Sequence, residues 1–118
     1  MKAENIIKLD TLNEMSGGDK SFISEIFTLF LSHVGSYIKD SENAFAGNDY
    51  PKLKKIAHKF KSSVQLFEIT EIVSLILKIE DSTFQNLHES EKQDILKRIK
   101  ELSLLAASQI KELSRNYN

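Results

Sequence analysis

The sequence predicts an all-α protein, an up-and-down four-helix bundle with a short extra N-terminal helix. Two observations lead to this fold class. All four glycines and the single proline, residues that commonly interrupt helices, lie within the first 51 of the 118 residues. Apolar residues recur at steps of three and four positions, as on one face of a helix, and do not alternate strictly as in a strand. The 67 residues after Pro51 are therefore expected to be almost entirely helical.

The first part of the chain carries signals for a short helix followed by a long one. The short helix is expected over residues 10–15, because Gly17 and Gly18 accept the left-handed conformation of a helix end. Asp19 suits the N-cap of the long helix, since its carboxylate can accept hydrogen bonds from free N–H groups. With Gly47 as the stop, the long helix is about 27 residues, or roughly 40 Å, long.

The third helix is predicted to begin after Asn48 or Asp49 as its cap. Pro51 is tolerated in the first turn, where its missing N–H would have no partner in any case. The end of this helix is expected within residues 68–70. Its apolar stripe consists of Leu53, Ile56, Ala57, Phe60, Val64 and Phe67.

Two more helices complete the predicted bundle. The fourth is expected over residues 70–81, and residues 81–89 resemble a polar connection. The fifth is predicted to start at Ser90, which together with Gln93 has the spacing of a capping box. Two apolar side chains in the connection are expected to pack it against the core, Phe84 and Leu87.

Length and composition limit the organisation and the chemistry of the chain. A length of 118 residues predicts a single domain over residues 1–118. The absence of cysteine excludes disulfides, thiolate metal sites and cysteine nucleophiles. No apolar run approaches the roughly 20 residues of a membrane span, and residues 1–10 lack the apolar stretch of a secretory signal. The expected protein is a free-standing cytoplasmic monomer without membrane attachment.

Charge is distributed unevenly along the chain. The formal net charge is −1, but residues 50–66 contain five lysines and no acidic residue. Such a basic patch on an acidic body would attract an anion or the acidic surface of a partner protein. A nucleic-acid partner is not expected, because Arg98 and Arg115 are the only arginines and aromatic residues do not interleave with the lysines on an exposed face.

His58 does not belong to the apolar stripe of the third helix. At about 100° per residue, its neighbours on the same face are Lys54, Lys61, Ser62 and Gln65, all of them polar. His58 is therefore predicted to point into solvent. His33, on the long helix, is predicted to be structural, His88 to be exposed, and the three histidines are too scattered to form a metal site.

The predicted surroundings of His58 suit the acceptance of a phosphoryl group. Nearby lysines disfavour the imidazolium, which leaves a neutral ring with a nucleophilic lone pair. Three of them lie within about one turn and could neutralise a phosphoryl group, Lys54, Lys59 and Lys61. The chain has no nucleotide-binding motif such as GxxxxGK[ST], so it is expected to carry a phosphoryl group rather than to act as a kinase. From the residues alone, a surface histidine on a solvated basic helix remains an open alternative.

Residues 57–63, which read AHKFKSS, resemble the AHxLKGS signature of histidine-containing phosphotransfer (HPt) domains. The resemblance extends over nearly the whole chain. Residues 12–19 and Phe22 are similar to that family's lead-in to its first long helix, and residues 47–50 are similar to its entry to the histidine helix. Residues 79–80, Ile-Glu, match a leucine–glutamate pair in the next helix.

The resemblance implies a carrier in a multistep phosphorelay, with His58 as the phosphoacceptor. His58 would take the phosphoryl group from the aspartate of a response-regulator receiver domain and pass it to another receiver. The implied partners are such receiver domains and a hybrid sensor histidine kinase. No cofactor is implied for this chain, because the Mg²⁺ used in the exchange belongs to the receiver.

The resemblance also assigns roles to the neighbours of His58. Lys61 matches the family lysine that contacts the phosphoryl group, Ser63 matches a small or hydroxyl position beside it, and Ser62 could donate a hydrogen bond. The residues that would line the surface for receiver docking are Lys54, Lys59 and Gln65. Ser62 and Glu68 stand where the family usually has glycine. These departures motivate the alternative of a helical adaptor that docks receivers without phosphotransfer.

Overall fold

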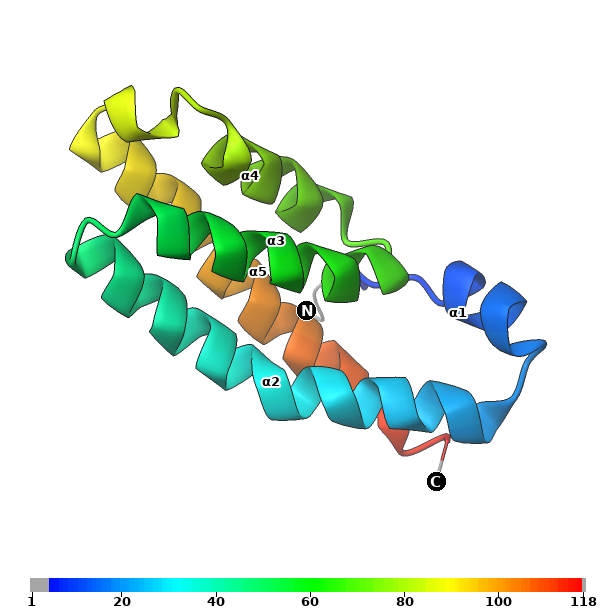
Figure 1. The fold of residues 1–118 in the computed structure, drawn as a ribbon. Helices are drawn as coiled ribbons and strands as arrows, with labels where there is room; N and C mark the ends of the chain where they lie inside the picture. The colour runs from blue at the N-terminus through cyan, green and yellow to red at the C-terminus, as the bar shows by residue number, and fades with distance from the viewer. Residues whose placement is uncertain (1–4, 118) are drawn as a thin grey trace.

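The computed structural model describes residues 5–117 and confirms the predicted fold class (Figure 1). Four long helices alternate in direction and form the bundle, while a short helix lies at the end where the first long helix begins. The elements are α1 (Asp10–Ser16), α2 (Lys20–Ala46), α3 (Tyr50–Leu66), α4 (Thr70–Glu80), η1 (Phe84–Asn86) and α5 (Glu89–Ser114). Within the described residues, no helix has the length and apolar character needed to cross a membrane.

The apolar stripes of the helices meet in one core. On α3 every predicted stripe residue is buried except Ile56, which is half-buried. Aromatic rings join α2 to α3 and to its C-cap, Phe67: the ring centroids of Phe30 and Phe67 lie 5.3 Å apart, and those of Tyr37 and Phe60 lie 3.7 Å apart in a stacked arrangement. These contacts hold α3 in one rotational setting against α2, which decides which of its side chains face outward.

Most helix boundaries agree with the predictions from capping residues. The Asp19 carboxylate accepts hydrogen bonds from the backbone N–H groups of Ser21 and Phe22, so α2 begins at Lys20 and spans 27 residues, as predicted. At the start of α3, Asp49 accepts a hydrogen bond from the backbone N–H of Lys52. The sequence-based choice between two caps is thereby settled in favour of Asp49.

The predicted start of the last helix is wrong. Helix α5 begins at Glu89, with His88 as its N-cap and no side-chain hydrogen bond at the cap. Ser90 therefore already lies inside the helix, where its hydroxyl cannot cap the first turn, and the capping box with Gln93 does not form. The connection before it is ordered by the short helix η1, whose Phe84 is fully buried as expected.

Glu68 turns the chain from α3 into α4 in a left-handed conformation, with φ of 54°. The Ile69 N–H donates to the carbonyl oxygen of Val64 at 3.1 Å, which closes the end of α3. The Glu68 carboxylate accepts a hydrogen bond of 3.3 Å from the Thr11 N–H in the first turn of α1. The backbone of Glu68 is therefore strained, because residues other than glycine rarely adopt positive φ. Its side chain links this turn to α1.

We predict that Glu68→Gly is about 1 kcal/mol more stable than Glu68→Ala, because both lose the hydrogen bond to Thr11 but only glycine adopts positive φ without steric cost. Urea unfolding of the two variants measures the difference. Glu25, an exposed residue inside α2, is the matched control, where alanine is expected to exceed glycine by about 1 kcal/mol. Equal stability of the two variants at position 68 would contradict the role of the left-handed turn.

Candidate functional site

His58 lies on the outer face of α3, with 70% of its side chain exposed. The reason is the register of the helix: Ala57 and Phe60 take inward positions, at 0% and 6% exposure, and leave the two residues between them, His58 and Lys59, facing solvent. The prediction that the imidazole points outward is confirmed.

Glu80, the last residue of α4, holds one nitrogen of this ring. The Nδ1 atom of His58 lies 3.0 Å from Oε2 of Glu80, across the antiparallel contact between α3 and α4. A carboxylate accepts hydrogen bonds and does not donate them, so the proton of this bond sits on Nδ1. In the neutral ring, Nε2 then carries the lone pair, and Nε2 is the atom that can attack an electrophile.

The same carboxylate also binds Lys61. The Nζ atom of Lys61 lies 2.7 Å from Oε1 of Glu80, and the lysine side chain is only 17% exposed. The hydrogen bond from Lys61 is the largest cause that lowers the pKa of Glu80 below its ordinary value of 4.5; partial burial opposes this effect and the bond with His58 adds to it. Glu80 thus joins His58 and the lysine one turn further along α3.

This arrangement predicts how the pKa of Glu80 responds to a mutation. The ionised carboxylate and its two bonds are present above the ordinary pKa, and the stability they contribute is lost as the pH falls through the lowered pKa. In Lys61→Met the pKa of Glu80 is expected to rise toward 4.5, because its main hydrogen-bond donor is gone. Carbon-13 NMR of the Glu80 carboxyl between about pH 2 and 7 follows the titration. Lys39→Met, at an exposed position on α2, should leave the curve unchanged; an unaltered pKa in Lys61→Met would refute the assignment.

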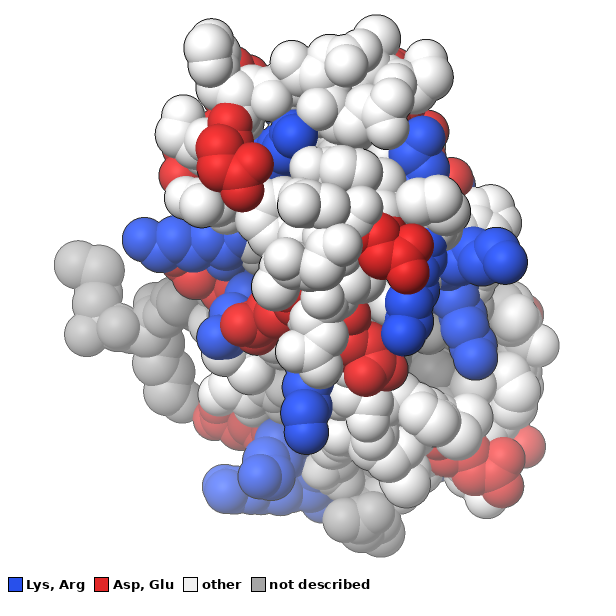
Figure 2. All heavy atoms as spheres, turned by 60° about the vertical axis from the view of Figure 1, so that its left-hand side comes forward, with Lys and Arg blue, Asp and Glu red and all other residues white. Residues whose placement is uncertain are grey.

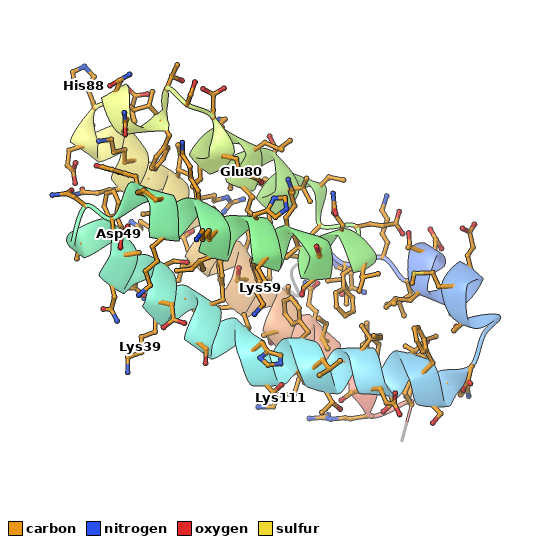
Figure 3. All side chains as sticks on the ribbon, in the orientation of Figure 1. Lys39, Asp49, Lys59, Glu80, His88 and Lys111 are labelled. Carbon is orange, nitrogen blue, oxygen red and sulfur yellow. The ribbon has the colours of Figure 1, made fainter. Side chains whose placement is uncertain are left out.

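Three lysines of α3 share a shallow cavity of about 430 Å³ with His58 and Glu80. They are Lys54, Lys55 and Lys59, of which the first and last were predicted and Lys55 was not. In Figure 3, Glu80 lies on the α4 side of α3 and Lys59 on the α2 side. No residue spacing links Glu80 to His58, because the two are 22 residues apart and meet only through helix packing. The one sequence signal for Glu80 is the family resemblance at residues 79–80.

The serines and glutamine predicted from the sequence lie in different surroundings. Ser62 and Gln65 are exposed on α3. Ser63 is half-buried and lines two cavities between α2 and α3 together with His33, and it does not line the cavity that contains His58. The reason is angular: five residues along a helix place Ser63 about 140° away from His58.

The prediction that His33 is structural is wrong. Its side chain is exposed on α2, because Phe30 and Val34 occupy the inward positions on either side of it. His88 is exposed at the far end of the bundle, as predicted (Figure 3). Among residues 5–117, no group of histidine and acidic side chains comes together in a way that could hold a metal ion.

The positive charge of the basic patch predicted on α3 is partly offset in the structure by carboxylates that follow in the sequence. Glu80 pairs with Lys61, and Asp81 lies close enough to Lys54 for that charge to lower its pKa, although hydrogen bonds from Thr83 are the main cause. Figure 2 shows similar mixing at one end of the bundle, where basic and acidic side chains are interspersed. The field at His58 therefore comes from lysines and carboxylates together.

Comparison with known proteins gives one match. The family model of the Hpt domain matches residues 25–115. The matched range begins within α2, ends at the C-cap of α5 and contains His58, Lys61 and Glu80. No curated protein and no solved structure matches the chain.

Proposed function

Because the chain belongs to the Hpt domain family, whose members act in phosphorelays with receiver domains, we propose that His58 is its phosphoacceptor. His58 takes a phosphoryl group from the aspartate of one receiver and passes it to the aspartate of another. One observation carries this proposal: an imidazole exposed over 70% of its side chain, with Nδ1 held at 3.0 Å by Glu80, presents Nε2 to an incoming protein.

The proposed transfer needs no base, because Nε2 of the neutral ring carries a lone pair and no proton. Nε2 of neutral His58 attacks the phosphorus of the aspartyl phosphate, the bond from phosphorus to the aspartate oxygen breaks, and the receiver carboxylate leaves with the electron pair. The new N–P bond places a positive charge on the ring. The proton stays on Nδ1, which continues to donate its hydrogen bond to the Glu80 carboxylate. Attack by the second receiver's carboxylate reverses these steps. Alignment and charge stabilisation are the main requirements of such a reaction.

Neighbouring side chains of α3 support the transfer. Lys61 neutralises charge on the phosphoryl group, and Ser62, small and exposed, leaves room for the receiver and can donate a hydrogen bond. Ser63 does not line the cavity that contains His58, so its role is packing between α2 and α3. Exposed or half-buried groups around His58 form the docking surface for the acidic face of a receiver, Lys54, Lys59 and Gln65.

The partners supply what this chain does not have. Mg²⁺ is bound by the receiver, and the phosphoryl group originates from a hybrid sensor histidine kinase. The absence of a nucleotide-binding motif from the 118-residue sequence supports a carrier rather than a kinase. We propose that the domain works as a monomer in the cytoplasm and binds no nucleic acid.

Transfer from a radiolabelled receiver tests the proposal. The full chain is mixed with receiver domains of the same organism that carry phosphate on aspartate, and the label is then followed. The expected label on the chain is lost in acid, is stable in base, and maps by mass spectrometry to the peptide with His58. Failure of every receiver to transfer label would overturn the proposal. Binding of a receiver without any label would instead support the adaptor.

We further predict that Lys61→Ala slows phosphoryl transfer about 10- to 100-fold. Removing one positioned donor typically costs about 100-fold or more, and partial exposure of Lys61 weakens the effect. Single-turnover transfer from a labelled receiver gives the rate. Lys39→Ala removes the same charge from a side chain that points away from α3 (Figure 3) and should transfer at the wild-type rate. A wild-type rate in Lys61→Ala would rule out contact with the phosphoryl group.

A further inference from the structure

A cleft of about 340 Å³ opens between α2 and α5, on helices that do not carry His58 or Glu80. This volume lies in the range of small-molecule sites. Four of its ten lining residues are aliphatic or phenylalanine, Ile38 and Phe45 from α2 and Leu96 and Ile99 from α5. An apolar group of modest size placed here would lose its contact with water on the side facing α2 and on the side facing α5.

Two hydroxyl groups of α2 also line the cleft and are poorly satisfied. Tyr37 and Ser41 are 8% and 4% exposed. Their hydroxyls lie close to each other without a well-aligned hydrogen bond, and neither has another partner among the described residues. Burial raises the pKa of Tyr37 to about 12, and the adjacent Ser41 offsets part of this rise. The phenol therefore remains a donor at neutral pH. Buried hydroxyls of this kind usually have a partner, and each of these two has the other beside it.

The rim of the cleft is positively charged on balance. Lys97 and Lys100 line it from α5 and Glu42 lines it from α2. Lys100 and Glu42 form an exposed ion pair with an N–O distance of 3.4 Å, and such a pair contributes little to the stability of the fold. Lys97 makes no ion pair within residues 5–117. One ammonium group is thus left to meet an anion at the edge of an apolar surface.

We propose that this cleft binds a small amphiphilic carboxylate. The apolar body lies between Phe45 and Leu96, and the carboxylate meets Lys97 and Lys100 at the rim. The site is separate from His58 and does not depend on phosphotransfer, because all its side chains come from α2 and α5.

Titration of the nitrogen-15-labelled full chain with octanoate tests this proposal. Octanoate at up to about 10 mM is expected to shift the amide signals of Ser41, Phe45, Leu96 and Lys97 in a saturable manner, which corresponds to a millimolar dissociation constant. Octylammonium, with the same chain and the opposite charge, is expected to bind at least about 3-fold more weakly. Equal binding of the two probes, or no saturable shift with octanoate, overturns the proposal.

Variants separate the site from non-specific association. The double change Lys97→Gln and Lys100→Gln should weaken octanoate about 3- to 10-fold and leave binding of neutral octanol unchanged. Lys39→Gln with Lys111→Gln removes two exposed lysines elsewhere on the same helices and should bind octanoate as the wild type does. Filling the cleft with Ser41→Leu is expected to abolish the shifts; thermal unfolding of this variant verifies that it is folded. Equal loss in both double variants contradicts the assigned site.

Discussion

Replacement of His58 with glutamine is expected to abolish the uptake of phosphoryl groups from receiver domains. Glutamine keeps a polar side chain of similar length on the outer face of α3 but has no nucleophilic nitrogen, since its amide lone pair is delocalised. The fold should be unaffected, because the imidazole is 70% exposed and touches no part of the core. Label transfer from a phosphorylated receiver measures the loss, which should be complete within detection.

The other histidines of the chain provide matched controls for this variant. His33 and His88 are both exposed, on α2 and at the start of α5, and neither has a carboxylate partner among the described residues. His33→Gln and His88→Gln are therefore expected to accept label as the wild type does. Label that persists in His58→Gln and disappears in either control would move the phosphoacceptor to a different helix.

Truncation of Phe67 is expected to have the largest effect on stability, with Phe67→Ala lowering the free energy of unfolding by about 3–5 kcal/mol. The side chain is fully buried where α3 ends, and its ring packs against Phe27 and Phe30 of α2 at centroid distances of 5.9 and 5.3 Å. Its carbonyl oxygen also accepts a 2.8 Å hydrogen bond from the N–H of Lys8. Loss of the ring leaves a cavity where three segments meet.

Urea unfolding followed by circular dichroism measures this loss. Leu104, which is 50% exposed on α5, is the control, and Leu104→Ala should change the free energy by no more than about 0.5 kcal/mol. A loss of less than about 1 kcal/mol in Phe67→Ala would mean that the end of α3 is not packed as described.

The bundle could be predicted from the sequence because its signals are local. Asp19 and Asp49 cap the helices that follow them, and the apolar stripe of α3 fixes which face is buried. The start of α5 was missed because Ser90 and Gln93 have the spacing of a cap, while the actual N-cap, His88, makes no side-chain bond that a pattern could reveal. Capping motifs predict what a residue can do, and neighbouring packing decides where the first turn begins.

The site could be predicted only in part, for a related reason. The outward direction of His58 follows from the periodicity of one helix, so it was available from the sequence. Its contact with Glu80 depends on how α3 and α4 lie against each other, and no spacing within either helix encodes it. The same limit applies to Lys61, whose position on α3 was foreseen while its ion pair was not.

The hydrogen bond between Nδ1 of His58 and Glu80 also limits from which side a partner protein can reach the ring. With one edge of the imidazole tied to the neighbouring helix, only the opposite edge is open, and it opens onto a single side of the protein. If His58 is the phosphoacceptor that we propose, donor and recipient would have to occupy the same surface in turn and not together. The first partner would then have to dissociate before the second could bind.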